Sequence, residues 1–173
     1  WAWTFAYTYT DATEAGSLTS STAGSGFGGQ LSFNANEAEE HTSRYEIENR
    51  VTGSVDWKHA FFGDYHTRVG LVYEGRSGRP YSYIFGGDAN GDSRTFNDLF
   101  YVPNPGDVLF GTLNSTTGAF TPNPVAELAF FSWLGQDAQH DLKQYQGSYA
   151  PENAFRAAWT NTFDVRFTQE LPG

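Results

Sequence analysis

The most constraining feature of this chain is a period-two alternation of apolar and polar residues, present in four separate stretches. Successive side chains of a β-strand point to opposite faces, so each stretch predicts a strand with one apolar and one polar face. In the first stretch the apolar positions are all aromatic: Trp1, Trp3, Phe5, Tyr7 and Tyr9. In the second stretch the polar positions include Glu46, Arg50, Asp56 and Lys58. A face with so many charges must meet water. The pattern therefore indicates an all-β chain whose aromatic face meets either a protein core or lipid.

The composition excludes several classes of protein. The 20 Asp and Glu residues against 10 Lys and Arg give a formal net charge of −10, so we expect no nucleic-acid partner, because no basic patch could neutralise phosphates. Cys is absent, which excludes a disulfide framework and a thiol nucleophile. No run of about 18 apolar residues occurs, which excludes a membrane helix but leaves membrane-spanning strands open. The chain opens within one predicted strand and ends in a predicted turn, so we expect an internal piece of a larger protein.

Four antiparallel strands are predicted at about residues 1–12, 44–59, 65–77 and 154–170. A short turn at Gly63-Asp64 joins the second and third of them. The connection at 13–43 is rich in Ser, Thr, Gly and Ala and shows no strand or helix period, so it is predicted to be a loop. The connection at 78–153 is also predicted to be a long loop, with one helical pattern from Val125 to Tyr145 that breaks near Gly135.

The order of long, short and long connections is typical of an outer-membrane β-barrel, which has short periplasmic turns and longer extracellular loops. A periplasmic turn at 60–64 would place loops 13–43 and 78–153 outside the cell. Aromatic residues near the strand ends, such as Trp57 and Trp159, fit the girdles at the two membrane interfaces. We therefore predict an all-β fold, an antiparallel transmembrane β-barrel segment of about four strands from a larger barrel. The alternative is a soluble β-sandwich, whose inner face would also be aromatic.

One loop, residues 87–98, has the spacing of a cation site. Five residues supply its oxygen side chains: Asp88, Asn90, Asp92, Asn97 and Asp98. Ca²⁺ takes 6–8 oxygen ligands, so Ca²⁺ is the candidate cofactor. The match to an EF-hand is imperfect, because Gly91 stands at the fourth position and Leu99 at the twelfth. The alternative is a turn in which Asx side chains bind their own backbone.

No catalytic constellation is found, and we do not expect an enzyme. The four histidines are scattered and none has the spacing of a metal site: His41, His59, His66 and His140. No nucleophile elbow or phosphate-binding loop occurs. Charged residues of the polar faces, such as Arg50, Glu74 and Asp164, either contact a plug or substrate in a lumen or form a cross-strand charge ladder.

Several segments resemble TonB-dependent outer-membrane receptors, in particular the Oar-like group. The likeness is carried by residues 73–83 (YEGRSGRPYSY), 87–92 (GDANGD), 97–103 (NDLFYVP) and 149–154 (YAPENA), and by parts of 159–167. It spans most of residues 44–171. The resemblance implies a 22-stranded barrel with an N-terminal plug, driven by TonB and the proton-motive force, of which this chain supplies four consecutive strands.

The resemblance also sets the expected function. We expect a segment of a transporter or receptor in the bacterial outer membrane, whose wall and extracellular loops serve energy-coupled uptake. The expected partners are the remaining strands and plug of the parent protein, the TonB system acting through that plug, membrane lipid and an extracellular ligand that the sequence does not identify. Two alternatives stay open: a surface-binding or adhesion protein that transports nothing, and a soluble calcium-dependent β-sandwich binding module.

Overall fold

The computed structural model describes residues 1–16, 20–34, 36–37, 39–136 and 139–172. Positions 17–19, 35 and 38 of the first predicted loop, 137–138 of the second and 173 at the chain end lie outside the described residues. The chain forms two compact units. Unit 1 comprises Trp1–Glu14, Thr42–Tyr81 and Arg156–Gly173, and unit 2 comprises Ala15–His41 and Ser82–Phe155.

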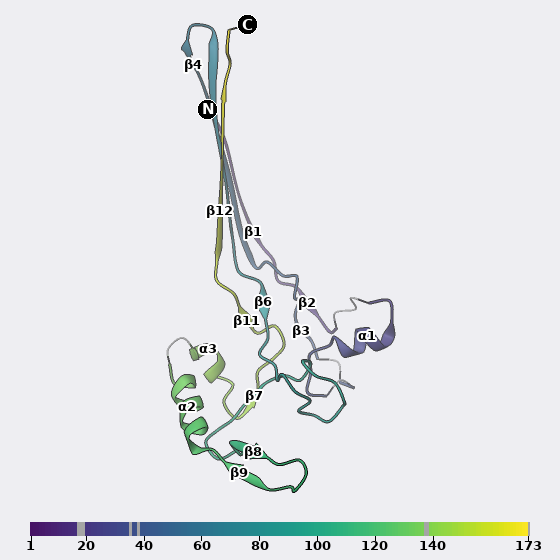
Figure 1. Ribbon diagram of the computed structural model, residues 1–173. Helices are drawn as coiled ribbons and strands as arrows, with labels where there is room; N and C mark the ends of the chain where they lie inside the picture. The colour runs from purple at the N-terminus through teal and green to yellow at the C-terminus, as the bar shows by residue number, and fades with distance from the viewer. Residues whose placement is uncertain (17–19, 35, 38, 137–138, 173) are drawn as a thin grey trace. The chain divides into compact units, whose positions relative to one another are not determined.

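Unit 1 is built on one antiparallel sheet of four long strands in the order β1-β4-β5-β12, and Figure 1 shows these long strands running together. The strands are β1 (Ala2–Tyr9), β4 (Asn49–Phe62), β5 (Tyr65–Arg76) and β12 (Thr160–Gln169). Strands β1 and β12 are the two edges, so the sheet does not close within the described residues. The β4–β5 turn falls where it was predicted, and Gly63 adopts a φ of +66° that glycine takes without steric cost. The prediction of an antiparallel, β-rich chain is confirmed.

The pairing register assigns the residues of the sheet to two faces. Directly opposed residues share a face, and in the middle of the sheet a row crosses all four strands. One row is Trp3, Val55, Leu71 and Val165, and the neighbouring row on that face is Phe5, Gly53, Tyr73 and Phe163. The row between them, on the other face, is Thr4, Ser54, Val72 and Asp164. The aromatic positions of the alternating pattern in all four strands therefore lie on one face of one sheet.

Three predicted strands differ from the structure at their ends. The first ends at Tyr9 rather than near residue 12. The second begins at Asn49 rather than near 44, because the chain first makes a turn in which the Glu46 N–H donates to the Ser43 carbonyl at 3.0 Å. The fourth becomes a long strand only at Thr160. Alternation continues through such irregular segments, so it predicts the faces of a strand better than its ends.

Short elements make up the rest of the chain. The strands are β2 (Thr13–Glu14), β3 (His41–Thr42), β6 (Pro80–Tyr81), β7 (Tyr101–Val102), β8 (Gly111–Leu113), β9 (Phe120–Pro122), β10 (Ser148–Tyr149) and β11 (Phe155–Arg156). The helices are α1 (Ala23–Gly28), α2 (Pro124–Leu134) and α3 (His140–Lys143). Helix α1 and strands β2, β3 and β6 to β10 lie in the predicted loops 13–43 and 78–153. Strands of two or three residues carry no detectable period.

Unit 2 has a hydrophobic core of its own. Its buried members come from four elements and the segments beside them: Val102, Leu134, Leu142, Ala150 and Phe155. The two helices confirm the helical pattern at 125–145 and its break, since α2 ends at Leu134 with Gly135 as its C-terminal cap. The side chain of Asn123 caps the other end of α2 and accepts a hydrogen bond from the Ala126 N–H at 3.0 Å. The segments predicted as loops therefore contribute most of a folded unit.

No helix in the described part of the chain is both long and apolar enough to cross a membrane.

Candidate functional site

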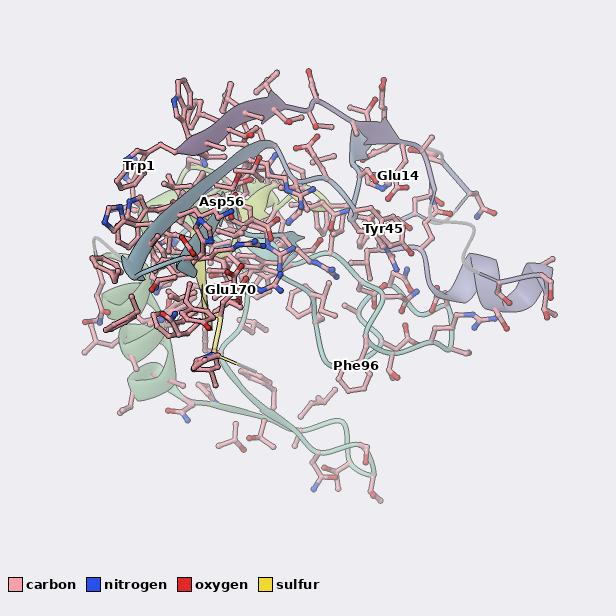
Figure 2. All side chains as sticks on the ribbon, turned by 90° about the horizontal axis from the view of Figure 1, so that it is seen from above. Trp1, Glu14, Tyr45, Asp56, Phe96 and Glu170 are labelled. Atoms are coloured by element: carbon pink, nitrogen blue, oxygen red, sulfur yellow. The ribbon has the colours of Figure 1, made fainter. Side chains whose placement is uncertain are left out.

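One face of the sheet in unit 1 is aromatic and exposed. This aromatic face consists of Trp1, Trp3, Phe5, Tyr7, Tyr9, Val51, Val55, Trp57, Val69, Leu71, Tyr73, Phe163, Val165 and Phe167. Trp3 is 76% exposed, Phe163 65% and Val165 72%, although such side chains are normally buried. Figure 2 labels Trp1 at the outer edge of the sheet, where its side chain points away from the strands. Within unit 1, many of the large apolar side chains of this face are therefore exposed.

The opposite face of the sheet is polar and charged. This polar face includes Thr4, Thr8, Arg50, Thr52, Ser54, Asp56, Lys58, Arg68, Glu74, Arg76, Thr162, Asp164, Arg166 and Thr168. Arg50 of β4 pairs with Glu74 of β5 at 2.7 Å, a diagonal contact between neighbouring strands. This pair is one rung of the predicted cross-strand charge ladder. A Cβ added at Gly70 would lie 3.1 Å from the Asp56 carboxylate, so the absence of a side chain at Gly70 leaves room for Asp56.

Aromatic rings gather at the end of the sheet that carries the β4–β5 turn. Trp57 contacts Trp1 at a centroid distance of 5.9 Å and Phe61 at 5.4 Å, and it stacks on His59 at 5.9 Å. The rings of Phe61 and Phe62 continue the cluster.

A buried carboxylate, that of Glu46, lies at the other end of the sheet. Glu46 is only 4% exposed and lies in the segment before β4. One oxygen accepts a hydrogen bond from the Ala12 N–H at 2.6 Å, and the other bonds to the guanidinium of Arg156. The same guanidinium reaches Glu48 at 3.0 Å. Glu46 therefore joins the segments beyond the ends of β1, β4 and β12, a role that the alternating pattern did not reveal.

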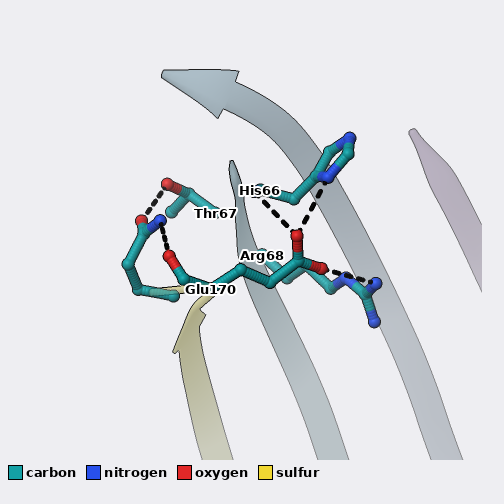
Figure 3. A network of polar contacts seen from close by, with 5 residues as sticks. His66, Thr67, Arg68 and Glu170 are labelled. Carbon is teal, nitrogen blue, oxygen red and sulfur yellow. Dashed lines mark hydrogen bonds and ion pairs between the residues drawn. The ribbon is translucent and has the colours of Figure 1, made fainter. Parts of the chain in front are cut away.

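A polar network joins β5 to the end of β12, as Figure 3 shows. Glu170 accepts hydrogen bonds from the backbone N–H of His66 at 3.0 Å and pairs with the His66 ring at 3.1 Å. Its second oxygen accepts from Arg68 at 3.2 Å. Thr67 donates to Gln169 beside it. The arrangement fixes the pairing of the two strands and contains no nucleophile placed against a base.

The predicted calcium residues lie in unit 2, and their oxygens bind the local backbone. Asp88 accepts hydrogen bonds from three N–H groups, those of Gly91 at 2.6 Å, Asp92 at 3.1 Å and Ser93 at 2.9 Å. Asn90 accepts one from the Asp92 N–H at 2.9 Å. These are the contacts of the Asx-rich turn. The positive φ values of Gly91 (82°) and Ser93 (66°) belong to the same tight turn.

The remaining predicted ligands lie at the end of this turn. Asn97 donates to Asp92 at 3.1 Å, and Asp98 accepts from the Ala89 N–H at 2.6 Å. Asn97 and Asp98 are buried, and the second carboxylate oxygen of Asp98 has no hydrogen-bond partner among the described residues. No group of three or more His, Cys, Asp or Glu side chains in the described ranges is arranged to hold a metal ion. Calcium binding stays a prediction, while the Asx contacts are present.

Two of the scattered histidines have acidic partners. His66 pairs with Glu170, and His41 lies 3.4 Å from Glu152, with both side chains about nine-tenths buried. Each pair ties together segments distant in sequence.

Sequence reasoning missed an aromatic cavity in unit 2. Its walls come from Phe33, from residues of the segments 85–89, 100–103 and 108–110, from Phe130 of α2 and from Tyr149 of β10. The available signal was the density of Phe and Tyr residues between 83 and 149, an unusual composition for a surface loop.

Comparison with known proteins adds no relative. No family model matches the chain, and no curated protein or solved structure matches it.

Proposed function

We propose that this chain is part of the wall of an outer-membrane TonB-dependent transporter or receptor. In this proposal its four long strands cross the membrane, and the segments at 13–43 and 78–153 are the extracellular, ligand-facing part. The observation that carries the proposal is the two-sided sheet: the aromatic face is exposed along all four strands, while the polar face carries charges and ion pairs. Strands with lipid on one side and an aqueous lumen on the other have this alternation.

The magnitude of the exposed apolar area favours lipid over water. Burial of apolar surface stabilises by about 25 cal/mol per Å², and soluble monomers rarely leave a contiguous apolar patch of more than a few hundred Å² uncovered. Trp1, Trp3 and Phe5 alone are 85%, 76% and 66% exposed. A bilayer covers such a face without a second protein layer.

The unpaired edges of the sheet also determine which partners this proposal requires. Edge strands β1 and β12 present unpaired backbone groups, and such groups must be paired inside a membrane. The remaining strands of the parent barrel would pair with them. The plug of the parent protein would contact the TonB system, and the polar face would line the lumen. No catalytic role is proposed.

A pair of arginine substitutions in the parent protein tests the lipid assignment. Val165 lies in the middle of β12 on the aromatic face, and Thr162 lies on the polar face of the same strand. Arginine at the bilayer midplane costs about 2–4 kcal/mol on a lipid-facing site, whereas an exposed site in water tolerates it within about 0.5 kcal/mol. We expect V165R to reduce the folded protein in the outer-membrane fraction and T162R to leave it unchanged.

The same experiment can contradict the proposal. Equal tolerance of V165R and T162R would mean that the aromatic face does not meet lipid. Recovery of the parent protein in the soluble fraction would exclude an outer-membrane wall directly.

Surface binding without transport is the second candidate, and the separate core of unit 2 favours it. A unit that folds around its own core can hold a partner without a moving plug. Deletion of 78–153 and deletion of the plug of the parent protein distinguish the two functions: transport needs both parts, whereas adhesion is lost only with 78–153. The soluble calcium-dependent sandwich has less support, because the four long strands form a single sheet whose aromatic side chains are exposed.

A further inference from the structure

Unit 2 contains a cavity of about 480 Å³ that is open on one side. Small-molecule sites usually occupy about 300–1,000 Å³ and are lined mainly by apolar side chains. Seven aromatic side chains form most of the wall: Phe33, Phe85, Phe100, Tyr101, Phe110, Phe130 and Tyr149. None of the residues that line the cavity carries a charge at neutral pH.

The aromatic wall is held in place by contacts between its own rings. Phe33 and Tyr149 lie 4.5 Å apart between centroids, and Phe85 and Phe100 lie 4.9 Å apart. Phe130 of α2 contacts Phe110 at 5.5 Å. These distances fall in the range preferred by aromatic pairs. The cavity is therefore preformed, and a ligand does not have to order its walls.

The surrounding charge selects against anions. The Tyr101 hydroxyl at the edge of the cavity donates a hydrogen bond to Asp107 at 2.9 Å, which raises the pKa of Tyr101. Burial and the nearby Asp98 raise the pKa of Tyr149. Both hydroxyls are therefore neutral at physiological pH, and the acidic groups that act on them are Asp107 and Asp98. An anionic ligand would meet these carboxylates without a cationic partner in the cavity wall.

The size of the cavity limits what can occupy it. An α-helix with its side chains is about 10–12 Å across and would displace several of these rings. A molecule of two or three fused rings fits the volume and can lie against the ring faces in an offset or edge-on arrangement.

We propose that this cavity is a binding site for a small, uncharged, planar apolar molecule. The site depends only on unit 2, so it goes beyond the proposed membrane role and does not require it.

Naphthalene is the probe, and the protein is the whole protein that contains this chain, in the medium in which it is purified, with that medium alone as the blank for partition. Binding is followed by the NMR signals of the Ala89 and Val108 methyl groups, which line the cavity. We expect saturable shifts of both signals. Naphthalene-2-sulfonate, which adds an anionic group to the same ring system, should bind at least about tenfold more weakly.

A matched pair of variants tests the location. Leu109 lines the cavity and is 80% exposed, while Leu128 of α2 lies outside it and is 74% exposed. Neither substitution removes a buried side chain, so both variants keep the fold. L109D should weaken naphthalene binding about tenfold because it places a carboxylate in the apolar wall, whereas L128D should not change it.

Three outcomes would overturn the inference. Shifts that grow linearly without saturation indicate partition alone. Equal loss of affinity in L109D and L128D places the bound molecule outside the cavity. Equal binding of the neutral and sulfonated probes excludes the uncharged class. None of these outcomes depends on where the parent protein is located in the cell, so this inference and the membrane proposal can fail separately.

Discussion

Glu170 binds His66 twice, through the backbone N–H at 3.0 Å and through the ring at 3.1 Å. The first contact aligns the chain after β12 with the start of β5, and the Glu170 N–H donates back to the His66 carbonyl at 3.0 Å. Arg68 holds the other carboxylate oxygen, as Figure 3 shows. One carboxylate thus fixes the register at the end of an edge strand.

The first prediction concerns this carboxylate. Glu170→Gln removes the negative charge that faces His66 and Arg68, and we expect the backbone amides of Gln169 and Glu170 to exchange about two- to fivefold faster, since exposed ion pairs contribute little. Hydrogen exchange followed by mass spectrometry measures this effect. Glu39→Gln is the control, because Glu39 is an exposed residue of unit 2. Unchanged exchange in the Glu170 variant would show that the backbone contacts alone hold the strand end.

The second prediction separates the two interpretations of residues 87–98. Asp88→Ala removes the acceptor for the three N–H groups of the turn, and we expect a loss of about 1 kcal/mol in the local stability of this loop without added Ca²⁺. Asp88→Asn keeps one acceptor oxygen and should lose less. A calcium site would behave differently, because Ca²⁺ would stabilise the natural chain and neither variant. Thermal unfolding with Ca²⁺ and with a chelator distinguishes the two interpretations.

The faces of the sheet could be predicted from sequence because they depend on a local rule. Every second residue of a strand shares a face, so the aromatic positions could be assigned without knowing which strands pair. Gly63-Asp64 marked the turn for an equally local reason, and Gly135 marked the end of α2. The Asn123-Pro124 pair before α2 carries a further signal that was not used, a side-chain cap followed by proline in the first turn.

The core of unit 2 could not be predicted in the same way. Val102, Leu134 and Phe155 meet across long sequence separations, and the strands beside them have two residues each. Neither the two-residue period of a strand nor the 3.6-residue period of a helix is detectable in so short a segment. The burial of Glu46 was hidden for a related reason, since its partner Arg156 is distant in sequence. Such contacts follow from tertiary structure and leave no local pattern.

The third prediction concerns a glycine on the aromatic face. A Cβ at Gly75 would collide with the hydroxyl of Tyr73 and would lie 3.0 Å from the Trp159 ring. Gly75→Ala should therefore displace Tyr73 and break its hydrogen bond to Asn161, now 2.8 Å, at a cost of about 1 kcal/mol. Gly53→Ala is the control, because Gly53 lies on the same face with only a carbonyl at 3.8 Å from its added Cβ. Equal stability of the two variants would mean that Tyr73 moves aside freely.

The fourth prediction concerns the cap of α2. Asn123→Ala removes the acceptor for the Ala126 N–H and should destabilise unit 2 by about 1 kcal/mol. Asn123→Asp keeps the acceptor and adds a charge that the helix N-terminus favours, so its stability should equal or exceed that of the natural chain. Chemical denaturation followed by the fluorescence of Trp133, which packs on the core, measures both variants. A loss of stability in both would assign the effect to something other than capping.

The fifth prediction is a pH dependence at Asp107. Its carboxylate accepts hydrogen bonds from the Asn104 N–H at 2.8 Å and from the Tyr101 hydroxyl at 2.9 Å, and these bonds lower the pKa of Asp107. A carboxyl with a lowered pKa in the folded chain stabilises that chain fully above its ordinary pKa, about 3.9. The stabilisation is lost as the pH falls through the lowered value, because the unfolded chain binds the proton more readily.

The carboxyl carbon signal of Asp107, followed by NMR between about pH 2 and 6, measures this shift directly. We expect the midpoint of the Asp107 titration to lie below the ordinary pKa of an Asp side chain. Tyr101→Phe removes one of the donors to Asp107. In this variant the midpoint of the Asp107 titration should rise toward the ordinary value, while the hydrogen bond from Asn104 keeps it lowered. Asp107→Asn should remove the acid dependence of the Tyr101 and Asn104 signals. A midpoint at or above the ordinary value in the natural chain would show that these hydrogen bonds do not form in solution.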